Sequence, residues 1–268
     1  MNLLFLGDIV GKPGRLAVRQ LLPKLIHRER ADFVVANCEN VAGGAGVDPE
    51  SCKELFDAGA DVLTSGNHIW RRKEINDYLD REPRLLRPAN FPPGAPGRGW
   101  GTFSTAGGTT IGVVNLIGRV FMDPVDCPFQ AGDAIVRELQ AKTPVIFVDM
   151  HCEASSEKGA MAYHLAGRAS GVVGTHTHVQ TADQRVLDAG TAFMTDAGMC
   201  GPIDSVIGVK AELALRRFVT HLPVRFEPAA GRTVVQGAVV TIDDTSGRAV
   251  TERPGRCRLR PDRRTRSK

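Results

Sequence analysis

The sequence lacks paired cysteines and long apolar runs. Its six cysteines include no C-x-x-C pair and no close cluster, which argues against a thiolate zinc site and a disulfide framework. No apolar run approaches the roughly 20 residues that a helix needs to cross a bilayer. The apolar N-terminal stretch has no basic segment before it and soon reaches Asp8, so we interpret it as a strand rather than a signal peptide. We therefore expect a cytoplasmic protein with no membrane partner.

Glycine-rich nucleotide-binding motifs are also missing. The stretch VAGGAG at 41–46 has no G-K-[ST] sequence after it, and GDIVGKPGR at 7–15 does not have the G-x-G-x-x-G spacing. Nucleotide binding by a P-loop or a Rossmann loop is therefore not expected. We interpret the glycines at 43–46 as allowing the backbone to approach a metal centre.

Excess positive charge is confined to the C-terminal segment. The formal net charge is +4, but residues 253–268 contain eight basic residues and one acidic residue. The rest of the chain has 26 basic and 29 acidic residues. We predict a single domain over residues 1–252 and a basic, disordered tail over 253–268. Such a tail either contacts RNA weakly by electrostatic attraction or is only a solvated segment.

Short apolar runs alternate with helical patterns along the chain, which predicts an α/β fold with mixed, layered sheets. Strands are expected at 2–8, 32–40, 61–68, 109–118, 144–151, 171–178, 191–198, 223–229 and 232–244. Helices are expected at 14–30, 48–59, 130–142 and 208–220. Residues 82–101 are rich in Pro and Gly and are interpreted as an ordered loop or cap.

Polar residues follow five of the predicted strands, at the point where each strand ends. The five groups are Asp8, Glu39 with Asn40, Asn67 with His68, His151, and His176 with His178. Open α/β sheets bind their ligands at this carboxyl edge. In GTHTHV at 174–179, alternation along a strand would point both histidines to one face. The five groups together indicate a metal site.

The donor types narrow the chemistry of this site. Carboxylates, amide oxygens and imidazoles without thiolate suit Mn²⁺, Fe or Zn²⁺. The donors are too many for one ion, whereas two ions about 3.5–4 Å apart would use them all. Such a pair activates a bridging hydroxide and stabilises both the attacking and the leaving oxygen of a phosphate ester. The sequence therefore predicts metal-assisted phosphoester hydrolysis.

The ordered series of motifs resembles the calcineurin-type metallophosphoesterases. It departs from their pattern at Val10 in place of a histidine, at Glu39-Asn40 in place of Gly-Asp, at Ile69 and at Thr175. With GDIVGKPGR, NCENVAGG, SGNHIW, DMHCEASSEK, GTHTHVQTAD and TDAGMCGP, the chain closely resembles the YmdB-like family as far as about Asp243. This resemblance implies a four-layer α/β/β/α sandwich with mixed sheets. It also implies 2′,3′-cyclic nucleotide phosphodiesterase activity with two Fe or Mn ions, Zn being a further candidate.

The family's site residues can be carried over to this sequence. Glu39 would bridge both ions, and His68 would donate a proton to the leaving ribose oxygen. The remaining ligands fall into two sets: Asp8, Asn40 and His178 for one ion, and Asn67, His151 and His176 for the other. Asn40 would fill the place that the histidine replaced by Val10 has in the superfamily.

Several alternatives remain open from the sequence. The chain could be a regulatory metalloprotein that binds a nucleotide or RNA without turnover, or a broader phosphomonoesterase or nuclease. Its substrate could be a small cyclic nucleotide or an RNA-end phosphate, and it could form a homo-oligomer. Trp70 could stack on a base or pack in the core. Arg87 and Asn90 could reach the substrate phosphate or hold the loop that contains them.

Overall fold

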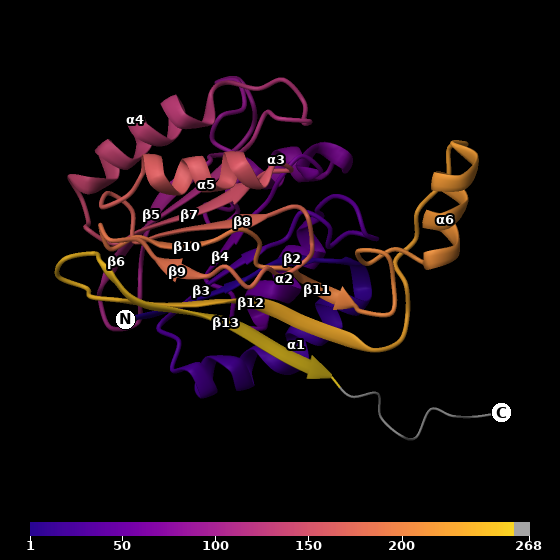
Figure 1. The fold of residues 1–268 in the computed structure, drawn as a ribbon, viewed down its shortest axis with the longest axis horizontal. Coiled ribbons are helices and arrows are strands. Elements are labelled where there is room, and N and C mark those ends of the chain that lie inside the picture. Colours follow the sequence, from indigo (N-terminus) through magenta and orange to yellow (C-terminus); the bar gives the residue numbers. More distant parts are fainter. Residues whose placement is uncertain (260–268) are drawn as a thin grey trace.

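The structure, a computed structural model, describes residues 1–259 and has four layers (Figure 1). Two β-sheets face each other, and helices cover the outer face of each sheet. This arrangement confirms the predicted α/β/β/α sandwich. Within the described residues, no helix has the length and apolar character needed to cross a membrane.

The first sheet contains seven strands in the order β2-β11-β12-β1-β3-β4, with β13 added beside β12. Their bounds are Asn2–Leu6 for β1, Asp8–Ile9 for β2, Phe33–Asn37 for β3, Val62–Thr64 for β4, Met199–Pro202 for β11, Thr233–Ile242 for β12 and Ala249–Leu259 for β13. Strands β1, β3 and β4 are parallel, so their carboxyl ends meet at one edge.

The second sheet contains six strands in the order β5-β6-β7-β8-β10-β9. Their bounds are Trp100–Ser104 for β5, Thr110–Ile117 for β6, Ile146–His151 for β7, Gly171–Thr175 for β8, Arg185–Val186 for β9 and Ala192–Met194 for β10. Strands β6, β7, β8 and β10 are parallel, whereas β5 and β9 are antiparallel edge strands. Both sheets are therefore mixed, as predicted.

The helices are α1 (Gly11–Glu29), α2 (Pro49–Asp57), the 3-10 helix η1 (Ile69–Arg71), α3 (Ile75–Arg81), α4 (Pro128–Gln140), α5 (Ser155–His164) and α6 (Ala211–Thr220). Asp48 caps α2 by accepting a hydrogen bond from the Ser51 N–H at 2.7 Å, and Pro49 follows at the first helical position. Helix α6 projects from the body of the molecule (Figure 1).

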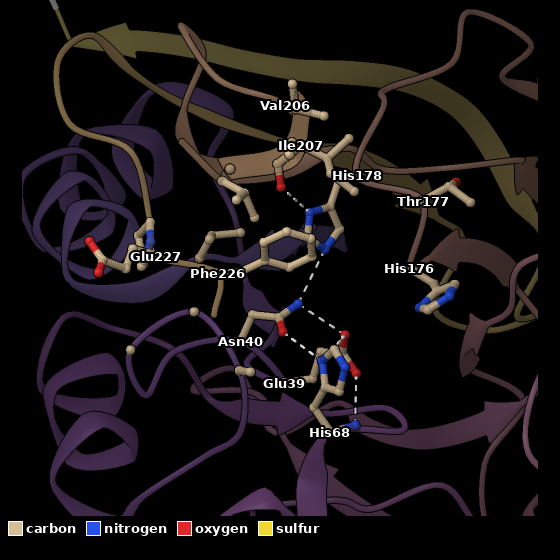
Figure 2. Close-up of a pocket in the computed structure, with 18 of the residues that line it drawn as sticks. Glu39, Asn40, His68, His176, Thr177, His178, Val206, Ile207, Phe226 and Glu227 are labelled. Atoms are coloured by element: carbon tan, nitrogen blue, oxygen red, sulfur yellow. Dashed lines mark hydrogen bonds and ion pairs between the residues drawn. The ribbon is translucent and has the colours of Figure 1, made fainter. Parts of the chain in front are cut away.

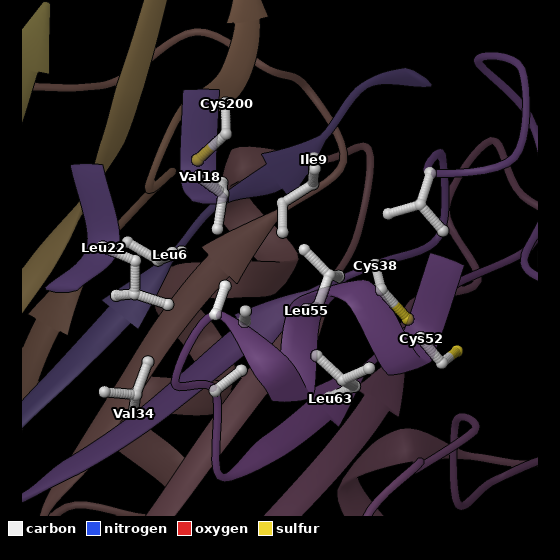
Figure 3. Close-up of a cluster of buried hydrophobic side chains, with 14 of the residues drawn as sticks. Leu6, Ile9, Val18, Leu22, Val34, Cys38, Cys52, Leu55, Leu63 and Cys200 are labelled. Carbon is white, nitrogen blue, oxygen red and sulfur yellow. The ribbon is translucent and has the colours of Figure 1, made fainter. Parts of the chain in front are cut away.

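The core has three parts because the central strands are buried on both faces. In β1, Leu3 and Phe5 point between the sheets, whereas Leu4 and Leu6 point toward α1 and α2. Phe5 meets Phe147 of the opposite sheet with ring centroids 5.0 Å apart. Figure 3 shows the helix-facing cluster against α1 and α2, and a third cluster lies beneath α4 and α5.

Two predictions about the C-terminal part were wrong. The predicted strand at 223–229 forms only an isolated bridge between Pro228 and Val209. Part of the predicted disordered tail, residues 253–259, belongs to β13 and pairs antiparallel with β12. The edge of β12 supplies unpaired backbone groups, which explains why a basic segment can be extended there. Residues 260–268, the rest of the predicted tail, lie outside the described residues.

Candidate metal centre

The structure brings all the predicted site residues to one place, where the carboxyl edges of the two sheets meet. Figure 2 shows five of them, Glu39, Asn40, His68, His176 and His178. Asp8 lies in β2, and Glu39-Asn40 and Asn67-His68 follow β3 and β4 of the same sheet. His151 ends β7, and His176 and His178 follow β8 of the other sheet. Asp8, Glu39 and His151 are at most 1% exposed. Each sheet thus supplies part of one buried polar cluster.

The first group of donors consists of Glu39, His151 and His176, whose ligand atoms all lie within 4.8 Å of one another. His151 Nε2 is 3.0 Å from Glu39 Oε2 and 3.1 Å from His176 Nδ1. Asn67 Oδ1 lies 3.2 Å from the same His151 nitrogen. The group therefore matches the predicted second set, with Glu39 included.

The second group consists of Asp8, Glu39 and His178, again with ligand atoms within 4.8 Å of one another. His178 Nε2 lies 3.7 Å from Asp8 Oδ1. Its other nitrogen, Nδ1, lies 2.8 Å from the Ile207 carbonyl oxygen, which favours a proton on Nδ1 and leaves Nε2 free to bind. Glu39 belongs to both groups, which is the position expected for a bridging carboxylate.

The charges in the cluster are strongly coupled. Burial raises the pKa of Asp8. Burial also works to raise the pKa of Glu39, but His151 and His68 beside it hold that pKa well below its usual value. For His151, burial is outweighed by Glu39 and the pKa rises to about 9, whereas burial and the charge of His151 lower the pKa of His176 to about 3. Without metal, one imidazolium thus serves as the partner of the central carboxylate.

Two observations bear on whether these residues fit a metal. The Asp8 Oδ1 atom is buried and has no hydrogen-bond partner among the described residues, which is costly for a carboxylate oxygen unless a cation binds it. A Cβ atom added at Gly66 would lie 2.2 Å from His151 Nε2 and 2.3 Å from Glu39 Oε2. Glycine at position 66 therefore lets the His151 and Glu39 donors lie directly against this loop.

Asn40 and His68 form the rim of the cluster. His68 Nδ1 lies 2.8 Å from Asn40 Oδ1 and 3.3 Å from Glu39 Oε1. The Asn40 amide nitrogen faces the opposite way, 2.9 Å from Glu39 Oε1 and 3.2 Å from His178 Nε2. Metal coordination through Asn40 Oδ1, as predicted, would require this amide to turn over.

The prediction that strand alternation aligns His176 and His178 was wrong. Strand β8 ends at Thr175, and both histidines have left-handed backbone, with φ of 95° and 63°. They consequently serve different donor groups. Thr177 between them is fixed by Asp196, whose carboxylate accepts from the Thr177 N–H at 3.1 Å and the Thr177 hydroxyl at 2.6 Å.

Lys158 also stabilises this loop, by contacts to Asp196 and Thr177. Its ammonium lies 2.9 Å from Asp196 and 3.2 Å from the Thr177 hydroxyl, and both charged side chains are at most 1% exposed. Gly174 makes room for the lysine, because a Cβ there would lie 2.6 Å from Lys158 Cδ. A buried ion pair thus holds the segment that carries two of the histidines.

Sequence reasoning missed three other side chains that orient the ligands. The Thr175 hydroxyl donates to Asp149 at 2.7 Å and lies 2.8 Å from His151 Nδ1. Glu153 lies 3.2 Å from His176 Nε2, so the opposite ring nitrogen, Nδ1, faces the donor group. Asp149 lies two residues before His151. The only feature of the sequence that could have indicated its role in orienting His151 is that an acidic residue stands inside an apolar strand.

Several open alternatives are decided by local contacts. Arg87 donates to the carbonyl oxygens of Pro96 and Pro88, and Asn90 donates to that of Ile117, so both hold the loop that contains them. Trp70 packs edge-on against Phe91, with ring centroids 5.6 Å apart. These three residues are therefore structural.

The glycines at 43–46 provide left-handed backbone and close packing. Gly43, Gly44 and Gly46 have φ of 70°, 94° and 92°. A Cβ at Gly44 would lie 2.9 Å from Pro228, a more specific reason for glycine than the predicted approach to a metal.

A cavity of about 820 Å³ opens from the donor groups. Glu39, Asn40, His68, His176 and His178 line its polar end, and segments 206–209 and 224–228 form an apolar wall, to which α6 adds Ala214 and Phe218. This volume is in the range of small-molecule binding sites, roughly 300–1,000 Å³. The centre is thus accessible to a ligand much larger than a phosphate ion.

Two facing mixed sheets with helices outside, and carboxylate and histidine donors at their shared edge, define the metallophosphoesterase class of fold. The sequence profile described as YmdB-like protein matches residues 4–253. The chain belongs to the YmdB-like family, which confirms the resemblance drawn from its motifs.

Similar proteins and solved structures cover nearly the whole chain. A protein of Bacillus subtilis (strain 168) named 2′,3′-cyclic-nucleotide 2′-phosphodiesterase is 49% identical over 93% of this chain and 94% of its own length. A hypothetical protein from Thermus thermophilus superposes with a TM-score of 0.90 at 41% identity, over 96% of this chain and 99% of its own. A structure described as a novel phosphatase of Mycoplasma pneumoniae also has a TM-score of 0.90, at 30% identity, over 96% and 93%.

Proposed function

We propose that the protein hydrolyses 2′,3′-cyclic nucleotides at a two-metal centre. The observation that carries this proposal is the pair of donor groups that share Glu39. Asp8, Asn40 and His178 would complete the site of one ion, and Asn67, His151 and His176 that of the other. The mixed O and N donors suit Fe or Mn, and also Zn. When bound, such a pair polarises a phosphate ester and supplies hydroxide at neutral pH.

The chain's own residues would hold the phosphate and move one proton. His68 lines the cavity beside the donor groups and is anchored through Nδ1 to Asn40 Oδ1 at 2.8 Å. Once the Asn40 amide has turned over to present Oδ1 to a metal, its amide nitrogen would donate to His68 Nδ1, and the proton on His68 Nε2 would be available to the departing ribose oxygen.

The name of the Bacillus subtilis relative supports the choice of substrate, because it specifies a 2′,3′-cyclic nucleotide and the 2′ ester bond. The same bond choice in this chain would leave a 3′-nucleotide as product. An RNA end with a 2′,3′-cyclic phosphate presents the same chemical group and is included in the proposal. Assembly as a homo-oligomer and weak RNA contact through the basic C-terminal residues remain predictions.

The test is turnover of 2′,3′-cyclic AMP by protein reconstituted with Mn²⁺ or Fe²⁺, beside 3′,5′-cyclic AMP and a phosphomonoester. We expect efficient hydrolysis of the 2′,3′-cyclic substrate alone. Hydrolysis of all three would indicate the broader esterase or nuclease. Two bound metals without turnover of any ester would indicate the regulatory metalloprotein and reject the proposal.

A further inference from the structure

The apolar wall of the cavity is built next to the metal donors and is held there by several contacts. Segment 206–209 turns back on itself through a bridge between Val206 and Val209. It is joined to segment 227–229 by hydrogen bonds from the Lys210 N–H to the Glu227 carbonyl at 3.0 Å and from the Ala229 N–H to the Gly208 carbonyl at 2.9 Å. The two segments therefore form one unit.

This unit is tied directly to the donor groups. The Ile207 carbonyl oxygen lies 2.8 Å from His178 Nδ1, so the wall shares a contact with a proposed metal ligand. Gly208 has φ of 98°, and a Cβ there would lie 2.8 Å from Val10 Cγ1. The wall thus packs against Val10, which stands where the calcineurin-type metallophosphoesterases have a metal-binding histidine. Its distance from the metal centre is fixed by packing.

Large apolar side chains on the wall are exposed to the cavity. Phe226 and Ile207 are 49% and 48% exposed, and both line the same cavity as His178 and Asn40. In Figure 2 the Phe226 ring points toward the His178 and Asn40 end of the site. About half of the Phe226 side chain is therefore left open to the cavity, where an apolar group of a ligand could cover it.

We infer that Phe226 is the stacking surface for the nucleobase of the substrate, with Ile207 beside it. The inference rests on the proposed function, and it adds a specificity-determining residue to that site. A phosphate held between the two donor groups leaves most of the 820 Å³ cavity to the nucleoside. The flat, apolar faces of a base complement an aromatic ring regardless of base identity, so the wall favours nucleosides in general over base-free phosphates.

The experiment compares the metal-loaded parent protein with Phe226→Ala, Phe226→Trp and Phe121→Ala. Phe121 is 90% exposed outside the cavity and is the matched control. The substrates are 2′,3′-cyclic AMP and the 2′,3′-cyclic phosphate of methyl riboside, which has no base. We expect Phe226→Ala to lower kcat/KM for the nucleotide about 5- to 100-fold, mainly through KM, and to leave the base-free substrate unchanged. Phe226→Trp should restore the nucleotide preference.

Calorimetric titration with 3′-AMP and with inorganic phosphate tests the inference without turnover. The parent should bind 3′-AMP more tightly than phosphate, and Phe226→Ala should lose this difference. A parent that shows this Phe226-dependent preference but hydrolyses no cyclic nucleotide would refute the proposed function and keep the base site. Equal losses for both substrates, or an unchanged nucleotide preference in Phe226→Ala, would overturn the inference. An unchanged preference with a lower molecular mass in light scattering would assign the ring to a contact between two copies.

Discussion

Replacing Lys158 with Met should destabilise the protein far more than a typical lysine substitution. The change keeps most of the apolar stem but leaves the carboxylate of Asp196 buried without its cation. Removal of one partner from a buried pair costs about 3–5 kcal/mol. We expect the lower end, because the Thr177 N–H, the Thr177 hydroxyl and the Gly198 N–H still donate to Asp196. For a chain of this size, about 3 kcal/mol corresponds to a fall in Tm of about 6–12 °C.

Thermal unfolding of the metal-free protein, followed by far-UV circular dichroism, measures this effect. Lys53→Met is the control, because Lys53 is an exposed lysine on α2. In the double variant Lys158→Met/Asp196→Asn, no buried charge remains at the pair, so a large part of the lost Tm should return. A Tm for Lys158→Met equal to that of the control, or a double variant less stable than the single one, would show that the pair does not support this loop.

Four further outcomes follow from the site. His176→Ala and His178→Ala should each lose bound metal, measured by elemental analysis; two ions in either variant would remove that histidine from the ligand set. His68→Ala should retain both ions and lose about 10²–10⁴ in kcat, and a parental rate would exclude proton donation by His68. Gly66→Ala should abolish metal binding, since its Cβ would lie 2.2 Å from His151 Nε2; normal metal content would mean that the loop shifts freely. Although burial lowers it, the pKa of His151 is raised to about 9 by Glu39, so below about pH 9 a metal ion must displace a proton from His151. The apparent Mn²⁺ affinity should therefore rise about tenfold per unit between about pH 6.5 and 8, and a flat profile would refute this.

The strand ends that build the centre were predictable from the sequence because parallel strands impose a simple geometry. Asp8, Glu39 and His151 each follow or end an apolar run, and such runs meet at one edge whatever the details of packing. The motif order then assigned the family. The geometry of the GTHTHV stretch was not predictable in the same way, because left-handed backbone at His176 and His178 depends on contacts from distant segments.

The supporting residues were missed for a related reason. Lysine on a helix is normally a surface residue, and only the approach of Asp196 from another strand end explains why Lys158 is buried. The C-terminal errors have the same origin. Residues 223–229 have a strand-like pattern but form their backbone hydrogen bonds with segment 208–210, and residues 253–259 are extended because β12 offers a free edge. Local hydrophobicity contains no information about such partners.

The division of the donor groups between the two sheets has a consequence for the proposed metal binding. Each group combines carboxylates from the first 40 residues with histidines from 151–178, so neither half of the chain can hold an ion in this geometry by itself. Under the proposed function, metal capture during synthesis would wait until His178 has left the ribosome and both sheets have docked. Bound ions would then join the two sheets at their shared edge. Metal release and separation of the sheets at this edge would be linked events, and metal loading would report that the sandwich has closed correctly.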